Sequence, residues 1–83
     1  MKYPALIDGE AGAYGVVFPD LPGCVAMGCT ISEVVRNAED AIRDWIASME
    51  ANGEMVPEPS PLASIAVPSG STLTSVSLVG VLQ

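Results

Sequence analysis

Three acidic residues in the first quarter of the chain, Asp8, Glu10 and Asp20, are the side chains whose chemistry would matter most if they met. Carboxylates that converge from neighbouring strands bind Mg²⁺ in metal-dependent nucleases. Here Asp8 ends a predicted strand, Glu10 lies in the following loop and Asp20 lies in a turn. Only the folding of loops would bring Asp8 and Asp20 together. We therefore expect no metal site and no cofactor, and a metal-dependent nuclease is the least favoured function.

Nucleophilic catalysis is also disfavoured, because the chain contains no His that would serve as the general base for a Ser or Cys. Cys24 and Cys29 lie five residues apart on a predicted strand, where they point to opposite faces and cannot form a disulfide. We expect both to be small packing residues in a reducing compartment, and Cys29 to be a buried, unreactive thiol. The glycine-containing segment 8–15 matches no phosphate-binding motif. These observations predict a protein that is not an enzyme.

The charge balance points to a protein partner. Ten acids against Lys2, Arg36 and Arg43 give the 83-residue chain a net charge of −7. Such a surface repels phosphate backbones and attracts basic proteins, although acidic side chains also serve solubility alone. A chain this short buries only about 60% of the surface that it exposes when unfolded, so self-association is expected as well.

Three short strands are predicted to position the acids. Segments 3–7, 14–18 and 24–29 have the composition of strands, and a rigid turn rich in proline separates the second from the third. Asp8-Gly9 is a known hairpin signal, and we expect it to open the turn between the first two strands. Connections this short produce an antiparallel meander.

A long amphipathic helix is predicted over residues 31–51. Thr30 and Glu33 have the spacing of a capping box, and Gly53 is a suitable C-terminal stop. Apolar residues recur every three or four positions and form one stripe: Ile31, Val34, Val35, Ala38, Ala41, Ile42, Trp45, Ile46 and Met49. Trp45 fits either core packing, which we favour, or a partner interface.

A single helix covers only one face of such a sheet. The opposite face would carry Leu6 and Val17, among others. An apolar face of this kind requires cover, either from the C-terminal tail or from a second subunit.

The C-terminal part of the sequence differs from the rest. Residues 1–60 form the predicted core domain, and residues 61–83 form a tail without any charge. Thr72 to Leu82 has the composition of a strand. An uncharged, β-prone segment aggregates when it is exposed, so we expect a fourth strand or a dimerisation strand, the alternative being a disordered terminus. Pro68 and Gly70 interrupt the apolar runs and exclude a membrane span in this tail.

Several sequence blocks occur in the order and spacing of a known family. They are YPALI at 3–7, YGVVFPDLPGC at 14–24, GCTISE at 28–33 and GEMVPEPS at 53–60. From Tyr3 to Ser60 the chain closely resembles the N-terminal domain of the HicB antitoxin family. The resemblance implies a partial RNase H-like, α+β fold of order β-β-β-α-β. Its antiparallel sheet would have three or four strands, with one long helix on one face.

The resemblance also implies a partner. HicB-like antitoxins bind HicA-like toxins, which are small basic ribonucleases that cleave mRNA, and the net charge of −7 fits such a partner independently. The candidate contact residues are exposed acids and one turn residue: Asp8, Glu10, Asp20, Leu21, Glu33 and Asp40. We expect a cytoplasmic antitoxin of a type II toxin–antitoxin system that forms a homodimer or a higher homo-oligomer.

The alternative is an orphan or truncated HicB-like module that binds another protein as a regulator or scaffold. Many members of the family continue into a module that binds operator DNA, whereas this sequence shows no second amphipathic helix and no basic cluster before Gln83. Direct DNA binding by this chain is therefore not expected, and neither is association with a membrane. A small basic open reading frame beside the gene would favour the antitoxin over the orphan.

Overall fold

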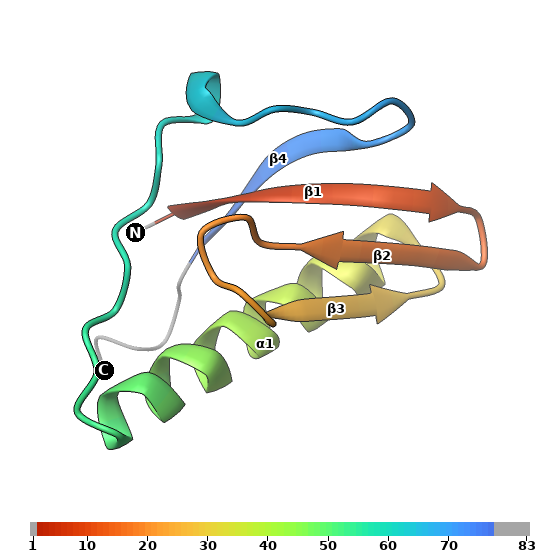
Figure 1. Ribbon diagram of the computed structural model, residues 1–83. Coiled ribbons are helices and arrows are strands. Elements are labelled where there is room, and N and C mark those ends of the chain that lie inside the picture. The colour runs from red at the N-terminus through yellow and green to blue at the C-terminus, as the bar shows by residue number, and fades with distance from the viewer. Residues whose placement is uncertain (1, 78–83) are drawn as a thin grey trace.

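The computed structural model describes residues 2–77, in which one long helix packs against one face of a four-stranded antiparallel sheet (Figure 1). The elements are β1 (Lys2–Glu10), β2 (Ala13–Val17), β3 (Val25–Gly28), α1 (Ile31–Ala51), the short 3₁₀ helix η1 (Leu62–Ser64) and β4 (Thr72–Ser77). The strand order in the sheet is β3-β2-β1-β4. The predicted α+β architecture, with its chain order β-β-β-α-β, is confirmed.

The hairpin between β1 and β2 turns later than the sequence suggested. β1 continues to Glu10, which pairs with Ala13, so the two-residue loop is Ala11–Gly12 and not Asp8–Gly9. Gly9 stays within the strand with a φ of 98°, and a β-carbon there would collide with the Ala13 carbonyl oxygen. Both observations require glycine at this position, and neither makes it a turn residue.

Two overlapping turns, Phe18–Leu21 and Leu21–Cys24, connect β2 to β3, and each is closed by a backbone hydrogen bond of 3.0 Å. Gly23 has a φ of 83°, the left-handed conformation that the second turn requires. The indole Nε1 of Trp45 on α1 donates to the Pro22 carbonyl at 3.1 Å, and its ring packs against the core. The helix therefore holds this turn in place.

α1 spans the range that the sequence predicts, and both of its ends are capped. At the N-terminus the Glu33 N–H donates to Thr30 Oγ1 at 3.1 Å. At the C-terminus Gly53 has a φ of 71°, and the Glu54 N–H donates to the Met49 carbonyl at 3.0 Å. A left-handed glycine with this hydrogen bond is a common helix stop.

The core lies between α1 and the sheet. Along α1 the buried side chains recur every fourth residue: Val34, Ala38, Ile42 and Ile46. They pack against side chains on one face of the sheet, among them Tyr3, Ala5, Ile7, Val16, Ala26 and Val76. Gly28 lets the end of β3 approach the start of the helix, because a β-carbon there would lie 2.7 Å from the Val34 backbone nitrogen. We call this side of the sheet the covered face and the other side the open face.

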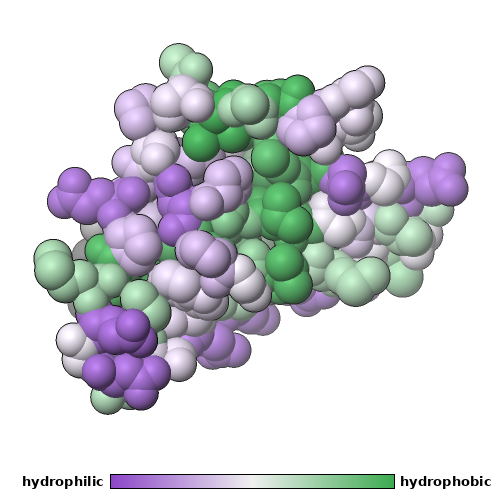
Figure 2. All heavy atoms as spheres, in the orientation of Figure 1, coloured by the Kyte–Doolittle hydropathy of each residue, from purple (hydrophilic) through white to green (hydrophobic). Residues whose placement is uncertain are grey.

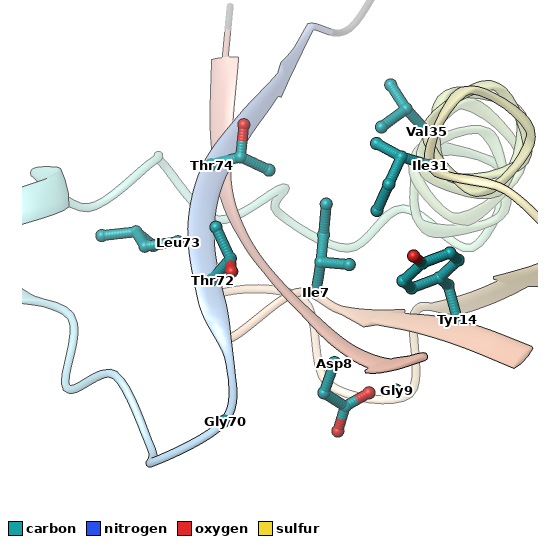
Figure 3. A pocket seen from close by; sticks show the side chains of 10 residues that line it. All are labelled: Ile7, Asp8, Gly9, Tyr14, Ile31, Val35, Gly70, Thr72, Leu73 and Thr74. Carbon is teal, nitrogen blue, oxygen red and sulfur yellow. The ribbon is translucent and has the colours of Figure 1, made fainter. Parts of the chain in front are cut away.

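β4 confirms the prediction of a fourth strand. It pairs antiparallel with residues 2–7 of β1, and the part of the predicted strand from 78 to Leu82 lies outside the described residues. After α1 the chain passes the end of the sheet where β1 begins, and η1 lies on the open-face side (Figures 1 and 3). No helix within residues 2–77 is both long enough and apolar enough to cross a bilayer.

Candidate protein interface

Asp8 and Glu10 lie near the end of β1, and both are exposed. Asp8 is on the open face, where its neighbours across the sheet are Gly15 on β2 and then Met27 on β3. The Asp8 Oδ1 lies 3.3 Å from the position that a β-carbon of Gly15 would occupy. The carboxylate therefore extends over the glycine, on the side of the sheet that also carries Met27.

Asp20 is half-buried and holds the chain that follows α1. Its two carboxylate oxygens accept hydrogen bonds from the N–H and the hydroxyl of Ser60, each at 2.7 Å. The Tyr3 hydroxyl donates to the Pro57 carbonyl at 2.6 Å. These contacts tie the segment from Pro57 to Ser60, which we call the strap, to the end of the sheet. Burial, and then the negative charges of Asp20 and Glu58, raise the pKa of the Tyr3 phenol.

Leu21 is fully buried and belongs to the core, so its side chain is not available to a partner as the sequence had suggested. The turn around it folds back over the sheet, which directs this apolar side chain inward. Asp40, by contrast, is exposed on the outer side of α1 and forms an ion pair with Arg43. An exposed pair of this kind contributes about 0.2–1 kcal/mol, so Asp40 is nearly free to interact with other molecules.

Glu33 and Cys29 lie together at the N-terminus of α1. The Glu33 carboxylate accepts from the Cys29 N–H at 2.8 Å and so helps to cap the helix. Cys29 is exposed, and the prediction of a buried thiol is wrong. β3 ends at Gly28, so Cys29 falls in the connection to the helix and outside the strand. Cys24 is buried as expected, and burial raises the pKa of its thiol to about 11.

The structure does not bring the predicted acids into one site. Asp8 and Glu10 lie at the far end of β1, and Asp20 lies beyond β2. Glu33 lies at the start of α1, and Asp40 lies on its outer side. β2 runs antiparallel to β1, and Asp20 follows its far end, so Asp8 and Asp20 lie at opposite ends of the sheet. Within residues 2–77, no group of three His, Cys, Asp or Glu side chains is placed to hold a metal ion.

An apolar surface on the open face is the more distinctive feature. Val17 on β2 and Val25 on β3 lie opposite each other and are 47% and 57% exposed, and Met27 is 73% exposed. We call these three residues and Asp8 the open-face patch. Figure 2 shows hydrophobic residues in a band that crosses the strands, with hydrophilic residues on both sides. The sequence predicted the exposure of Val17, but Val25 and Met27 were missed, and Leu6 is almost fully buried.

Comparison with known proteins gives one consistent family. The profile of HicB_like antitoxins of bacterial toxin–antitoxin systems matches residues 3–79. Over 65 residues, 77% of this chain and 47% of the relative, the chain is 35% identical to Antitoxin HicB of Escherichia coli K12. It is also 39% identical to an uncharacterised 14.9 kDa protein of Haemophilus phage HP1. That match spans 62 residues, which are 75% of this chain and 47% of the phage protein. The chain thus spans about half the length of these two curated relatives.

The fold has a close match among solved structures. A chain of a HicA3 and HicB3 toxin–antitoxin complex superimposes with a TM-score of 0.79 at 29% sequence identity. The match covers 93% of this chain and 96% of that chain, so the likeness extends over nearly the whole of both. Sequence and fold agree, and the chain belongs to the HicB-like antitoxin family.

Proposed function

We propose that this chain is an antitoxin that binds a small basic HicA-like toxin and neutralises it by contact, without catalysis. The observation that carries the proposal is the similarity, over nearly the full length of both chains, to a chain of a solved toxin–antitoxin complex. The net charge of −7 gives independent support, because it attracts a basic ribonuclease. The cytoplasm is the proposed compartment, since Cys24 and Cys29 are both unpaired.

We further propose that the toxin contacts the open-face patch. Val17, Val25 and Met27 are exposed on a sheet whose other face is packed against α1, so the surface is held rigid before binding. Apolar contacts of this kind form the centre of a protein interface, and the flexible methionine adapts to the partner's shape. Asp8 adds a carboxylate at the border of the patch, where a Lys or Arg of a basic toxin would pair with it.

The other predicted contact residues fit this role less well. Asp20 is engaged with the strap, Leu21 is in the core and the Glu33 carboxylate caps the helix. Glu10 and Asp40 are exposed and lie outside the patch. We expect these two acids to raise the rate of association by long-range attraction and to contribute little to the lifetime of the complex.

Co-expression with any small basic protein encoded beside the gene tests the proposal. The expected result is growth rescue and a stable complex that survives purification. Two substitutions in the patch, Asp8→Lys and Met27→Lys, are combined in one variant. This double variant is expected to raise the dissociation constant of the toxin complex by at least about a hundredfold, since buried contacts at an interface centre dominate affinity. Glu50→Lys is the matched control, because it makes the same charge reversal at an exposed site on the last turn of α1.

The outcomes distinguish a failure of the antitoxin function from a wrong assignment of the toxin-binding surface. A folded chain that neither binds nor rescues growth would contradict the antitoxin function and leave the orphan module. A chain that binds, but whose patch variant binds as tightly as the wild type, would show that the toxin uses another surface. Equal weakening by Glu50→Lys would mean that overall charge, and not the patch, governs the affinity.

A further inference from the structure

The two edges of the sheet differ in how their backbone groups are used. β3 has only four residues. The Asn37 side-chain amide donates to the Met27 carbonyl at 2.8 Å, so one carbonyl group of that strand already has a hydrogen-bond partner from α1. β4 has six residues, and within residues 2–77 no backbone hydrogen bond reaches it apart from those of its ladder with β1. In an antiparallel strand every second residue points its N–H and C=O away from its one neighbour. Among residues 2–77, nothing therefore bonds to the backbone groups on the outer edge of β4.

β4 also lacks the features that protect an edge strand from other chains. Natural proteins protect such edges with lysines, prolines, bulges or very short strands. The sequence of β4, Thr-Leu-Thr-Ser-Val-Ser, contains no charge and no proline, and its ladder with β1 is continuous. Threonine and valine favour the extended conformation. The strand is thus suited to accept another strand along its whole length.

The distribution of charge favours a second copy of this chain as the partner that supplies the added strand. All ten acids and all three basic residues lie at or before Glu58, and residues 59–77 carry no charge. Two chains that each carry −7 repel each other, and the repulsion is weakest where the surface is neutral. A basic partner would be drawn to the acidic surface and would gain no electrostatic attraction at β4.

An apolar hollow of about 320 Å³ lies beside the same edge, on the covered face (Figure 3). Ile31 and Val35 of α1 line one side, Thr72 and Thr74 of β4 line the other, and Ile7 points into the space between them (Figure 3). α1 lies mainly over β2 and β3, so it does not close this space. A strand added beyond β4 would carry side chains on this side and would extend the wall of the hollow.

We propose that β4 pairs antiparallel with β4 of a second copy, about a two-fold axis at Thr74, to give one continuous eight-stranded sheet. A two-fold interface uses the same residues from both chains, and strand β4 is complementary to itself in its backbone groups. With the axis at Thr74, Thr74 faces Thr74 of the second copy, a favourable cross-strand pair, while Leu73 faces Ser75 and Thr72 faces Val76. The pairing does not depend on the proposed function, and it leaves the open-face patch exposed.

A charge-swap experiment at the axis tests the pairing. The full chain is expected to sediment as a dimer of about 17 kDa, twice its 8.5 kDa. Thr74→Lys and Thr74→Glu each place like charges beside each other, and each is expected to raise the dimer dissociation constant at least about tenfold. An equimolar mixture of the two variants should restore the dimer, because Lys then faces Glu. Thr74→Val keeps the shape and the strand preference and should leave the dimer intact.

Circular dichroism and thermal melting of each variant separate loss of pairing from loss of folding. A folded wild-type chain that stays monomeric up to millimolar concentration would overturn the proposal. So would a mixture that associates no more tightly than either charged variant alone. Deletion of residues 78–83 is expected to leave dimerisation by β4 in place. If the deletion abolishes association while Thr74→Glu does not, residues 78–83 carry the contact and the β4 pairing is wrong.

Discussion

The covered and open faces of the sheet differ in burial, and two consecutive residues of β2 show how. Val16 is fully buried against α1, whereas Val17 is 47% exposed on the opposite side. The same β-branched side chain thus stabilises the fold in one position and is left exposed in the next, where we propose that a partner binds. The alternation of a strand lets one short segment serve both purposes, so substitutions on the open face can change binding while the core stays intact.

The largest expected effect separates the two faces directly. Ile42→Ala removes a fully buried side chain from the covered face and should lower the free energy of unfolding by about 2–5 kcal/mol. Met27→Ala on the open face should change it by less than about 0.5 kcal/mol, because Met27 is 73% exposed. Urea denaturation measures both. A large loss for Met27→Ala would show that the open face is covered in solution.

An intermediate effect is expected for the strap, which leads the chain from the end of α1 toward the open-face side. Asp20→Ala leaves the Ser60 donors without their acceptor and should lower the free energy of unfolding by about 1–3 kcal/mol. In a double-mutant cycle with Ser60→Ala, most of this loss should appear as coupling free energy between Asp20 and Ser60. Glu58→Ala is the control, because Glu58 is exposed within the strap. Additive effects of Asp20→Ala and Ser60→Ala would contradict the contact.

The smallest effect concerns the covered face at high pH. Burial raises the pKa of the Cys24 thiol from 9.0 to about 11, so above pH 9 the unfolded chain loses this proton first. Stability from this group is complete below pH 9 and is lost between pH 9 and about 11. The raised pKa of Tyr3 acts in the same direction above pH 10. Cys24→Ala should flatten the fall in the urea midpoint over this range.

The exposed thiol provides the control for that measurement. Cys29→Ala makes the same substitution at an exposed thiol, in the connection to α1, and is measured beside Cys24→Ala. An equal flattening by Cys24→Ala and Cys29→Ala would show that the buried environment of Cys24 is not the cause.

Local signals made much of the fold predictable. α1 begins and ends where expected because Thr30, Glu33 and Gly53 act over a few residues each. The first hairpin was misplaced because Gly9 is required for a positive φ inside β1, while the turn itself uses Ala11–Gly12. Composition alone does not distinguish a glycine needed in a strand from one needed in a turn.

The surface was harder to predict, because it depends on contacts between distant parts of the chain. Asp20 looked exposed, but Ser60, forty residues later, occupies its carboxylate. Leu21 lies between two prolines in a turn, yet the turn folds inward. Asp8 keeps its place in the candidate interface because the register sets it in one row with Met27, with only Gly15 between them. The toxin contact and the homo-oligomer stay predictions.

The position of β4 beside β1 governs the order in which the chain assembles. Lys2 pairs with Ser77, so this ladder joins residues 75 positions apart (77 − 2), whereas β1, β2, β3 and α1 follow one another closely. Long loops close at a greater entropic cost and more slowly. During synthesis we expect the meander and α1 to form while β4 is still in the ribosome. β1 is then an unprotected edge, and rapid synthesis at high concentration favours exchange of β4 between neighbouring chains.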